Sequence, residues 1–96
     1  MKSDRFTYSN VSEDTTIEDT AATLHGMHLI SHTTGAVKCV IYDATTTATG
    51  TIVLSGSTST GASKVLMFDG GLECKTGIHV DVTCTSGADS VIIFYS

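Results

Sequence analysis

The stretch IHVDVTC, residues 78–84, decides the fold. Apolar side chains occupy every second position of it, namely Ile78, Val80, Val82 and Cys84. Successive side chains of a β-strand point to opposite faces, so this period of two predicts a strand with one face in a core. The positions in between are polar and are expected to face water or a partner, namely His79, Asp81 and Thr83.

Several further stretches extend this pattern along the chain. Residues 36–42, AVKCVIY, alternate in the same way, and a short apolar strand is expected at residues 51–54. The last stretch, VIIFY at residues 91–95, is apolar at every position, which predicts a strand covered on both faces. A single sandwich covers only one face of such a strand, so the other face is expected to meet another subunit.

Residues 21–32 are compatible with a helix or with a strand. A helix would gather three histidines on one face, but Gly26 interrupts it and no capping residue precedes it. The downstream pattern is that of strands throughout, so a strand is predicted here too. Met27 and Leu29 then share one face, His28 and Ile30 share the other, and Gly26 is a candidate β-bulge.

Glycine and serine clusters mark the turns between these strands. Asp69-Gly70-Gly71 predicts a tight hairpin turn, because glycine supplies the positive φ that such turns require. Residues 75–77 predict another turn, and the low-complexity residues 55–63 predict a flexible loop. About seven to eight short strands without a credible helix predict an all-β fold, an antiparallel β-sandwich that is jelly-roll-like.

The 96 residues fit one domain. Residues 1–20 are polar and acidic and predict an N-terminal arm, or a weak first strand around residues 6–8, while residues 21–96 form the predicted β-sandwich domain. The arm is interpreted as solvated, because short charge runs usually face water. An arm that reaches onto a neighbouring subunit is the functional alternative.

The charge balance argues against some classes of partner. Ten acidic residues against 5 basic ones give a net charge of -5, and without a basic stripe no nucleic-acid binding is expected. Apolar runs reach only about five residues, which predicts no signal peptide, no membrane span and no membrane partner. Three cysteines without a CxxC spacing predict reduced thiols in core or strand positions, namely Cys39, Cys74 and Cys84.

No motif predicts an enzyme, because the chain lacks a GxSxG elbow and a cysteine in an electropositive setting. Four aspartates lie in or beside predicted turns and are expected to bond the backbone there, namely Asp43, Asp69, Asp81 and Asp89. His28 and His32 share a strand face but lie about 13 Å apart, too far to hold one metal ion. No catalytic residue, cofactor or metal ligand is predicted, unless a symmetry axis brings histidines of several subunits together.

Four stretches together resemble small structural proteins of tailed bacteriophages, over roughly residues 21–96: VKCVIYD at 37–43, VLMFDGG at 65–71, TGIHVDVT at 76–83 and VIIFY at 91–95. The resemblance implies a β-sandwich or jelly-roll virion protein, made in the host cytoplasm, that decorates and cements the capsid. It implies a homo-oligomer, often a trimer, with the major capsid protein or other virion proteins as partners. A glycan- or receptor-binding module of a tail, neck or fibre is the alternative.

The expected association surface combines the last strand with the start of the chain. Because residues 91–95 are apolar on both faces, Ile92, Phe94 and Tyr95 are predicted to lie in a subunit interface. Phe6 and Tyr8 are predicted to anchor the arm in that interface.

Overall fold

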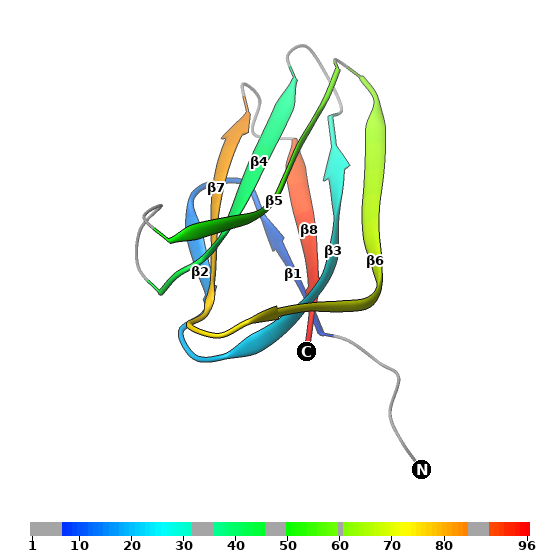
Figure 1. Cartoon of the computed structure of the whole chain (residues 1–96). Coiled ribbons are helices and arrows are strands. Elements are labelled where there is room, and N and C mark those ends of the chain that lie inside the picture. Colours follow the sequence, from blue (N-terminus) through cyan, green and yellow to red (C-terminus); the bar gives the residue numbers. More distant parts are fainter. Residues whose placement is uncertain (1–6, 32–35, 46–49, 60, 85–88) are drawn as a thin grey trace.

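Two four-stranded sheets pack face to face in this computed structural model, which describes residues 7–31, 36–45, 50–59, 61–84 and 89–96 (Figure 1). The strands of the first sheet are, in spatial order, β1 (Thr7–Val11), β8 (Ser90–Tyr95), β3 (Ala22–Ile30) and β6 (Ser63–Cys74). Those of the second are β2 (Thr15–Glu18), β7 (Ile78–Cys84), β4 (Val37–Asp43) and β5 (Thr51–Thr58). All neighbouring strands within a sheet pair antiparallel.

The strand order confirms the predicted fold class. Successive strands alternate between the two sheets at every connection except the one from β4 to β5. Eight strands in the orders β1-β8-β3-β6 and β2-β7-β4-β5 form the jelly-roll arrangement of an antiparallel sandwich. In the part of the chain that the structure describes, no helix is long and apolar enough to cross a membrane.

The core lies between the central strands of the two sheets. Side chains with no exposed surface come from β3 and β8 on one side and from β4 and β7 on the other, namely Leu24, Met27, Leu29, Val91 and Ile93, and Val37, Cys39, Ile41, Ile78 and Val80. These are the alternating apolar positions of the sequence, because only one face of each strand meets the opposite sheet. Full burial of each larger aliphatic side chain contributes about 1.5–3 kcal/mol.

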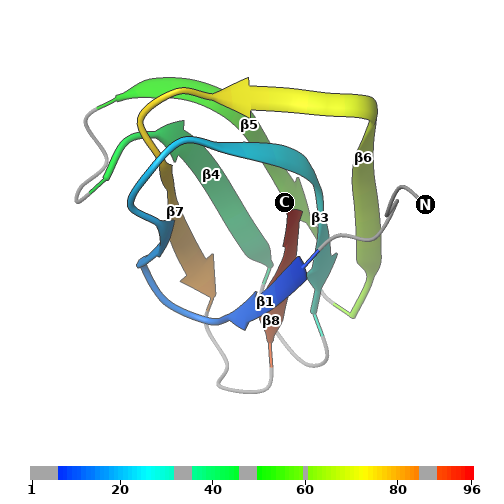
Figure 2. The same cartoon turned by 90° about the horizontal axis from the view of Figure 1, so that it is seen from below.

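β3 and β6 bend together at one corner of the sandwich (Figures 1 and 2). The pairing of β3 with β8 and with β6 shifts between Leu24 and Gly26, which confirms Gly26 as the site of a bulge. A side chain at Gly26 would collide with the backbone oxygen of Leu66. On β6 the partners jump from Leu72 to Met67, so this strand carries several extra residues at the corner.

The prediction of a hairpin turn at Asp69-Gly70-Gly71 is wrong. β6 runs without a break from Ser63 to Cys74, and both glycines lie within it at φ values of 91° and 83°. Positive φ serves a bulge as well as a hairpin turn. Here it turns one strand around the corner instead of joining two strands (Figure 2).

The prediction of a flexible loop at residues 55–63 is largely wrong as well. β5 continues through Thr58, since Lys38 and Val40 of β4 pair with Ser57 and Ser55. Composition favoured a loop, but pairing with a buried neighbour overrode it. Gly56 lies close above the first sheet, because a Cβ there would meet the Leu66 Cδ1 atom at 2.7 Å.

Residues 7–18, which the sequence assigned to an arm or a weak first strand, form the two strands at one side of the sandwich. β1 pairs with β8 from Thr7 to Val11, and β2 pairs with β7 from Thr15 to Glu18. The last residue is tied in as well, since Thr23 and Ser96 exchange two backbone hydrogen bonds of 2.9 Å.

The corner of β6 generates a testable difference between its two glycines. An alanine Cβ at position 71 would approach the Thr23 Cγ2 atom to 2.5 Å, whereas one at position 70 meets nothing within 4 Å. Both substitutions strain a positive φ, but only Gly71→Ala adds a steric clash. We expect Gly70→Ala to lower the free energy of unfolding by about 1 kcal/mol and Gly71→Ala by about 3 kcal/mol in urea denaturation. Equal losses would contradict the corner geometry.

Candidate functional site

Strand pairing sorts the residues of the first sheet into rows that point away from the core. Tyr8, Phe94, Gly26 and Met67 form one row across the four strands. Asn10, Ile92, His28 and Val65 form the next row. Ser90, Ile30 and Ser63 form a third. The positions between these rows, such as Ile93 and Met27, are fully buried, so the three rows lie on the outer side of the sheet.

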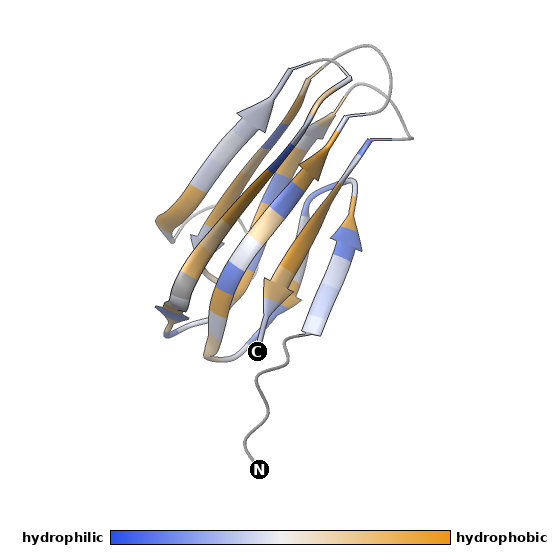
Figure 3. Ribbon diagram, turned by 90° about the vertical axis from the view of Figure 1, so that its right-hand side faces the viewer, coloured by the Kyte–Doolittle hydropathy of each residue, from blue (hydrophilic) through white to orange (hydrophobic). Residues whose placement is uncertain are grey.

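Large apolar side chains dominate these rows, which we call the apolar face. Tyr8 is 67% exposed, Val65 54% and Met67 46%. The remaining apolar members are half-buried, namely Ile30, Ile92 and Phe94. In Figure 3, β8, which ends at the C-terminus, is coloured hydrophobic along most of its length, although one of its sides faces outward. A contiguous apolar surface of this kind on a small domain is typical of an interaction site.

Three of the five predicted interface residues lie together on this face. Tyr8, Ile92 and Phe94 occupy neighbouring positions in its first two rows. Tyr95 points to the opposite side of β8 and packs against the core. Phe6 lies outside the described residues.

Sequence reasoning missed the part of the apolar face that β3 and β6 supply. Val65 and Met67 belong to VLMF, residues 65–68, which is apolar at every position. This is the same signal that pointed to residues 91–95, and it could have identified both side chains. His28, the row partner of Val65, was placed on the correct strand face, but nothing in the sequence paired that face with Ile92 and Val65.

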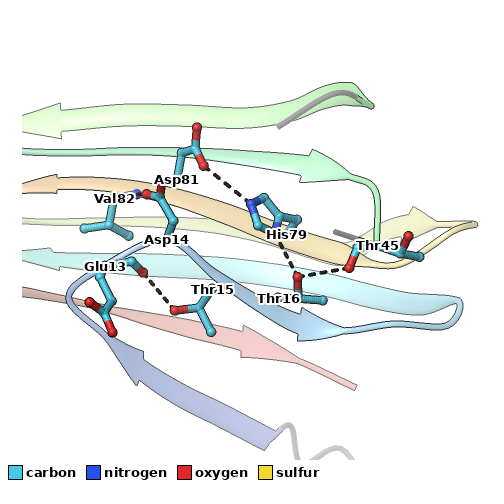
Figure 4. Close-up of polar contacts among 8 residues, drawn as sticks. All are labelled: Glu13, Asp14, Thr15, Thr16, Thr45, His79, Asp81 and Val82. Carbon is cyan, nitrogen blue, oxygen red and sulfur yellow. Dashed lines mark hydrogen bonds and ion pairs between the residues drawn. The ribbon is translucent and has the colours of Figure 1, made fainter. Parts of the chain in front are cut away.

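A polar cluster occupies the outer side of the second sheet, where β2 meets β7 (Figure 4). His79 was expected to face water or a partner, but it is only 6% exposed and packs against Thr16 of β2, so that expectation is wrong. Its Nδ1 atom lies 2.9 Å from the Thr16 Oγ1 atom, and its Nε2 atom lies 3.4 Å from an Asp81 oxygen. The Thr16 hydroxyl in turn donates a 2.9 Å hydrogen bond to the carbonyl oxygen of Thr45.

The hydrogen bond from Thr16 to the Thr45 carbonyl bears on the tautomer of His79. A carbonyl oxygen only accepts, so the single hydroxyl hydrogen of Thr16 points to Thr45. The contact with His79 therefore requires an Nδ1–H group that donates to the Thr16 oxygen.

The order Thr16, His79, Asp81 resembles that of the nucleophile, base and acid in a catalytic triad. The hydroxyl proton of Thr16, however, is not directed toward His79. A general base accepts the proton of the hydroxyl that it activates, whereas the Thr16 hydroxyl donates its hydrogen to the Thr45 carbonyl. In this arrangement the contacts hold β2 and the segment at Thr45 onto β7. The neighbouring Asp14 acts in the same way, since its carboxylate accepts a 2.9 Å hydrogen bond from the Val82 amide.

Asp43 organises the turn that follows β6. Its carboxylate accepts three backbone hydrogen bonds, of 3.0 Å from Lys75, 2.8 Å from Thr76 and 3.2 Å from Gly77. Desolvation alone would raise the pKa of this carboxyl group, but the three N–H donors and the charge of Lys75 outweigh it and lower the pKa. The prediction that Asp43 bonds the backbone of its own turn is wrong in its partner, because its carboxylate bonds the backbone of a turn far along the chain.

Two of the cysteines are inert core residues, as predicted. Cys39 and Cys74 have no exposed surface, and neither forms a disulfide. Burial, with the charges of Asp81 and Asp14, raises the pKa of Cys39 to about 12. Burial, with the charge of Asp43, raises the pKa of Cys74 to about 11. Both groups are thiols at neutral pH, and the thiol is not the nucleophilic form.

Within the described ranges, no group of three or more His, Cys, Asp or Glu side chains is placed to hold a metal ion. His28 lies on the apolar face, and His32 is outside the described residues.

Comparison with protein families, curated proteins and solved structures finds no match to the chain.

The proton position at His79 predicts the behaviour of two Thr16 variants. Thr16→Val leaves the buried His79 Nδ1–H and the Thr45 carbonyl without their shared partner, which should cost about 1–3 kcal/mol in urea denaturation. Thr16→Ser keeps the hydroxyl and should cost less than about 1 kcal/mol. Imidazole nitrogen chemical shifts of the wild-type protein should show a proton on Nδ1. A neutral ring with its proton on Nε2 alone would contradict the assignment.

The Asp43 turn predicts a pH-dependent loss of stability. The lowered pKa means that the carboxylate stabilises the fold above its unfolded-state value, near pH 4, and that this contribution disappears as the pH falls through the folded-state value. We expect Asp43→Asn to lower the free energy of unfolding by about 1 kcal/mol at neutral pH, with the difference from wild type shrinking as the pH falls below about 4. Asp19→Asn, at an exposed position, is the control. A difference that persists unchanged at pH 3 would refute this role.

Proposed function

We propose that this chain is a non-enzymatic structural protein that self-associates through its apolar face and serves as a cement or decoration protein of a tailed-phage particle. The observation that supports self-association is the gathering of six apolar side chains in adjacent rows of one sheet, three of them exposed. Exposure of such a surface to water is unfavourable, and a covering partner removes that cost.

The charge distribution favours a second copy as the partner. The chain carries a net charge of -5, so two copies repel each other wherever their acidic surfaces meet. None of the described side chains in the three rows is a carboxylate, an ammonium or a guanidinium group. Copies that meet through this face therefore bury apolar area without placing like charges against each other.

The size of the face favours contacts that are individually modest. Four strands at about 4.8 Å spacing span roughly 19 Å, so the face alone is at the small end of stable protein interfaces. Weak contacts of this size hold firmly when several copies act together, as on the repeated surface of a capsid. The phage assignment rests on the resemblance carried by residues 37–43, 65–71, 76–83 and 91–95, and the trimeric state rests on it too.

Glycan or receptor binding is the second candidate, and one observation favours it. Tyr8 presents an aromatic ring that is 67% exposed, and sugars stack on such rings. Self-association through the apolar face would cover this ring, because Tyr8 belongs to that face. Self-association and glycan binding are therefore separated by measuring mass and ligand binding on the same sample.

Val65→Lys tests the proposed association face. Val65 is 54% exposed, so lysine should be tolerated by the fold, but an ammonium group buried between copies is unfavourable. Lysine also makes the chain less acidic, so a loss of association cannot result from a larger overall net charge. We expect wild-type protein to form a closed oligomer in light scattering and the variant to dissociate with a Kd raised by at least about tenfold.

Ile52→Lys is the matched control, because Ile52 is 57% exposed but lies on β5 of the other sheet. It should associate as wild type does. Phe94→Asp should give a monomer with a retained β-sheet circular dichroism spectrum. A wild-type monomer at high concentration, or equal effects of the two lysine variants, would count against the proposed function and direct attention to glycan binding.

A further inference from the structure

His28 lies in the middle of the apolar face. It is on the central strand β3, half-buried, with Ile92 of β8 and Val65 of β6 as its direct neighbours across the sheet. The next rows place Phe94 and Met67 on one side of it and Ile30 on the other. His28 is thus an ionisable group surrounded by apolar side chains on the surface that the proposed function assigns to a second copy.

No described charged group accompanies His28 on this face. In its own row β1 contributes Asn10, β8 contributes Ile92 and β6 contributes Val65. Tyr8, the other titratable member of the face, lies in the adjacent row. Lys64 is in register with the buried Leu29 and so belongs to the opposite side of the sheet. A second copy that covers this face brings the same uncharged set.

We infer that His28 makes the self-association pH-dependent, so that mild acid separates the copies; this inference rests on the proposed function. Contact between two copies removes water from the imidazole ring. Loss of water disfavours the charged form of histidine, and no carboxylate on the face compensates for it. The separated chain therefore binds a proton on His28 more readily than the associated chain does. By linkage, protons shift the equilibrium toward the separated form.

The direction of this effect distinguishes it from the effect of overall charge. The isoelectric point is about 5.0, so acidification from about pH 7.5 to about 5.5 brings the net charge closer to zero. General repulsion between copies then becomes weaker, and association should tighten. His28 acts in the opposite direction over the same interval, because histidine changes its charge there.

Sedimentation equilibrium at about pH 7.5 and about pH 5.5 tests the inference. We expect the Kd of wild-type self-association to rise by about tenfold or more at the lower pH. His28→Gln, which keeps a polar side chain but cannot ionise, should associate equally well or better at the lower pH. His25→Gln is the matched control: His25 lies on the same strand, but its Nε2 atom pairs with the Ser96 hydroxyl at 2.9 Å. It should keep the wild-type pH response, and circular dichroism should confirm folding at both pH values.

The outcomes separate the inference from the proposed function. Wild-type protein that associates at about pH 7.5 through Val65 but equally tightly at about pH 5.5 would overturn the role of His28 alone. That role would also be overturned if His28→Gln kept the wild-type pH response, because another group, such as His79, would then be responsible for it. Wild-type protein that is monomeric at both pH values would overturn the proposed function and the inference together.

Discussion

The packing of two sheets through their inner faces is the constraint on which the rest of this molecule depends. Met27 and Ile93 of one sheet and Ile41 and Val80 of the other have no exposed surface. Side chains on a strand alternate, so a shift of pairing by one residue would turn these groups outward and bring their neighbours in. The burial of one set therefore determines which set the sheet presents to its surroundings.

This constraint defines the surface on which the proposed function rests. With Val91 and Ile93 in the core, β8 must turn Ile92 and Phe94 outward, although these are as apolar as the residues that it buries. An ordinary solvent-facing row carries polar side chains. The outward rows of the second sheet mix polar side chains such as Lys38 and Asp81 with Val40, Tyr42 and the exposed Ile52. Those of the first sheet contain no carboxylate, ammonium or guanidinium group among the described residues. The two faces of the sandwich therefore differ in charge, and the uncharged one is the face on which the proposed self-association rests.

Polar contacts at the periphery complete the fold where strands are short. β2 contains only four residues, and the contacts of Thr16 with His79 and with the Thr45 carbonyl join it to β7 and to the segment after β4. Asp43 supports the turn before β7 through three backbone amides. These hydrogen bonds satisfy backbone amide and carbonyl groups at the periphery, where the small apolar core does not hold the chain in place.

Local apolar patterns were sufficient to predict the all-β class, most of the core and the approximate positions of β3, β4, β7 and β8, because the period of two is a local property of a strand. The sequence also indicated that Ile92 and Phe94 lie outside the core, since VIIFY has more apolar positions than one sheet face can bury. Tertiary structure decided the rest. Gly70 and Gly71 adopt the positive φ that their identity permits, but only the pairing of β6 with β3 makes them a corner instead of a hairpin. Likewise, His79 is buried, and Val65 joins Ile92 across His28, because strands distant in the sequence meet in one sheet, and no local pattern contains that information.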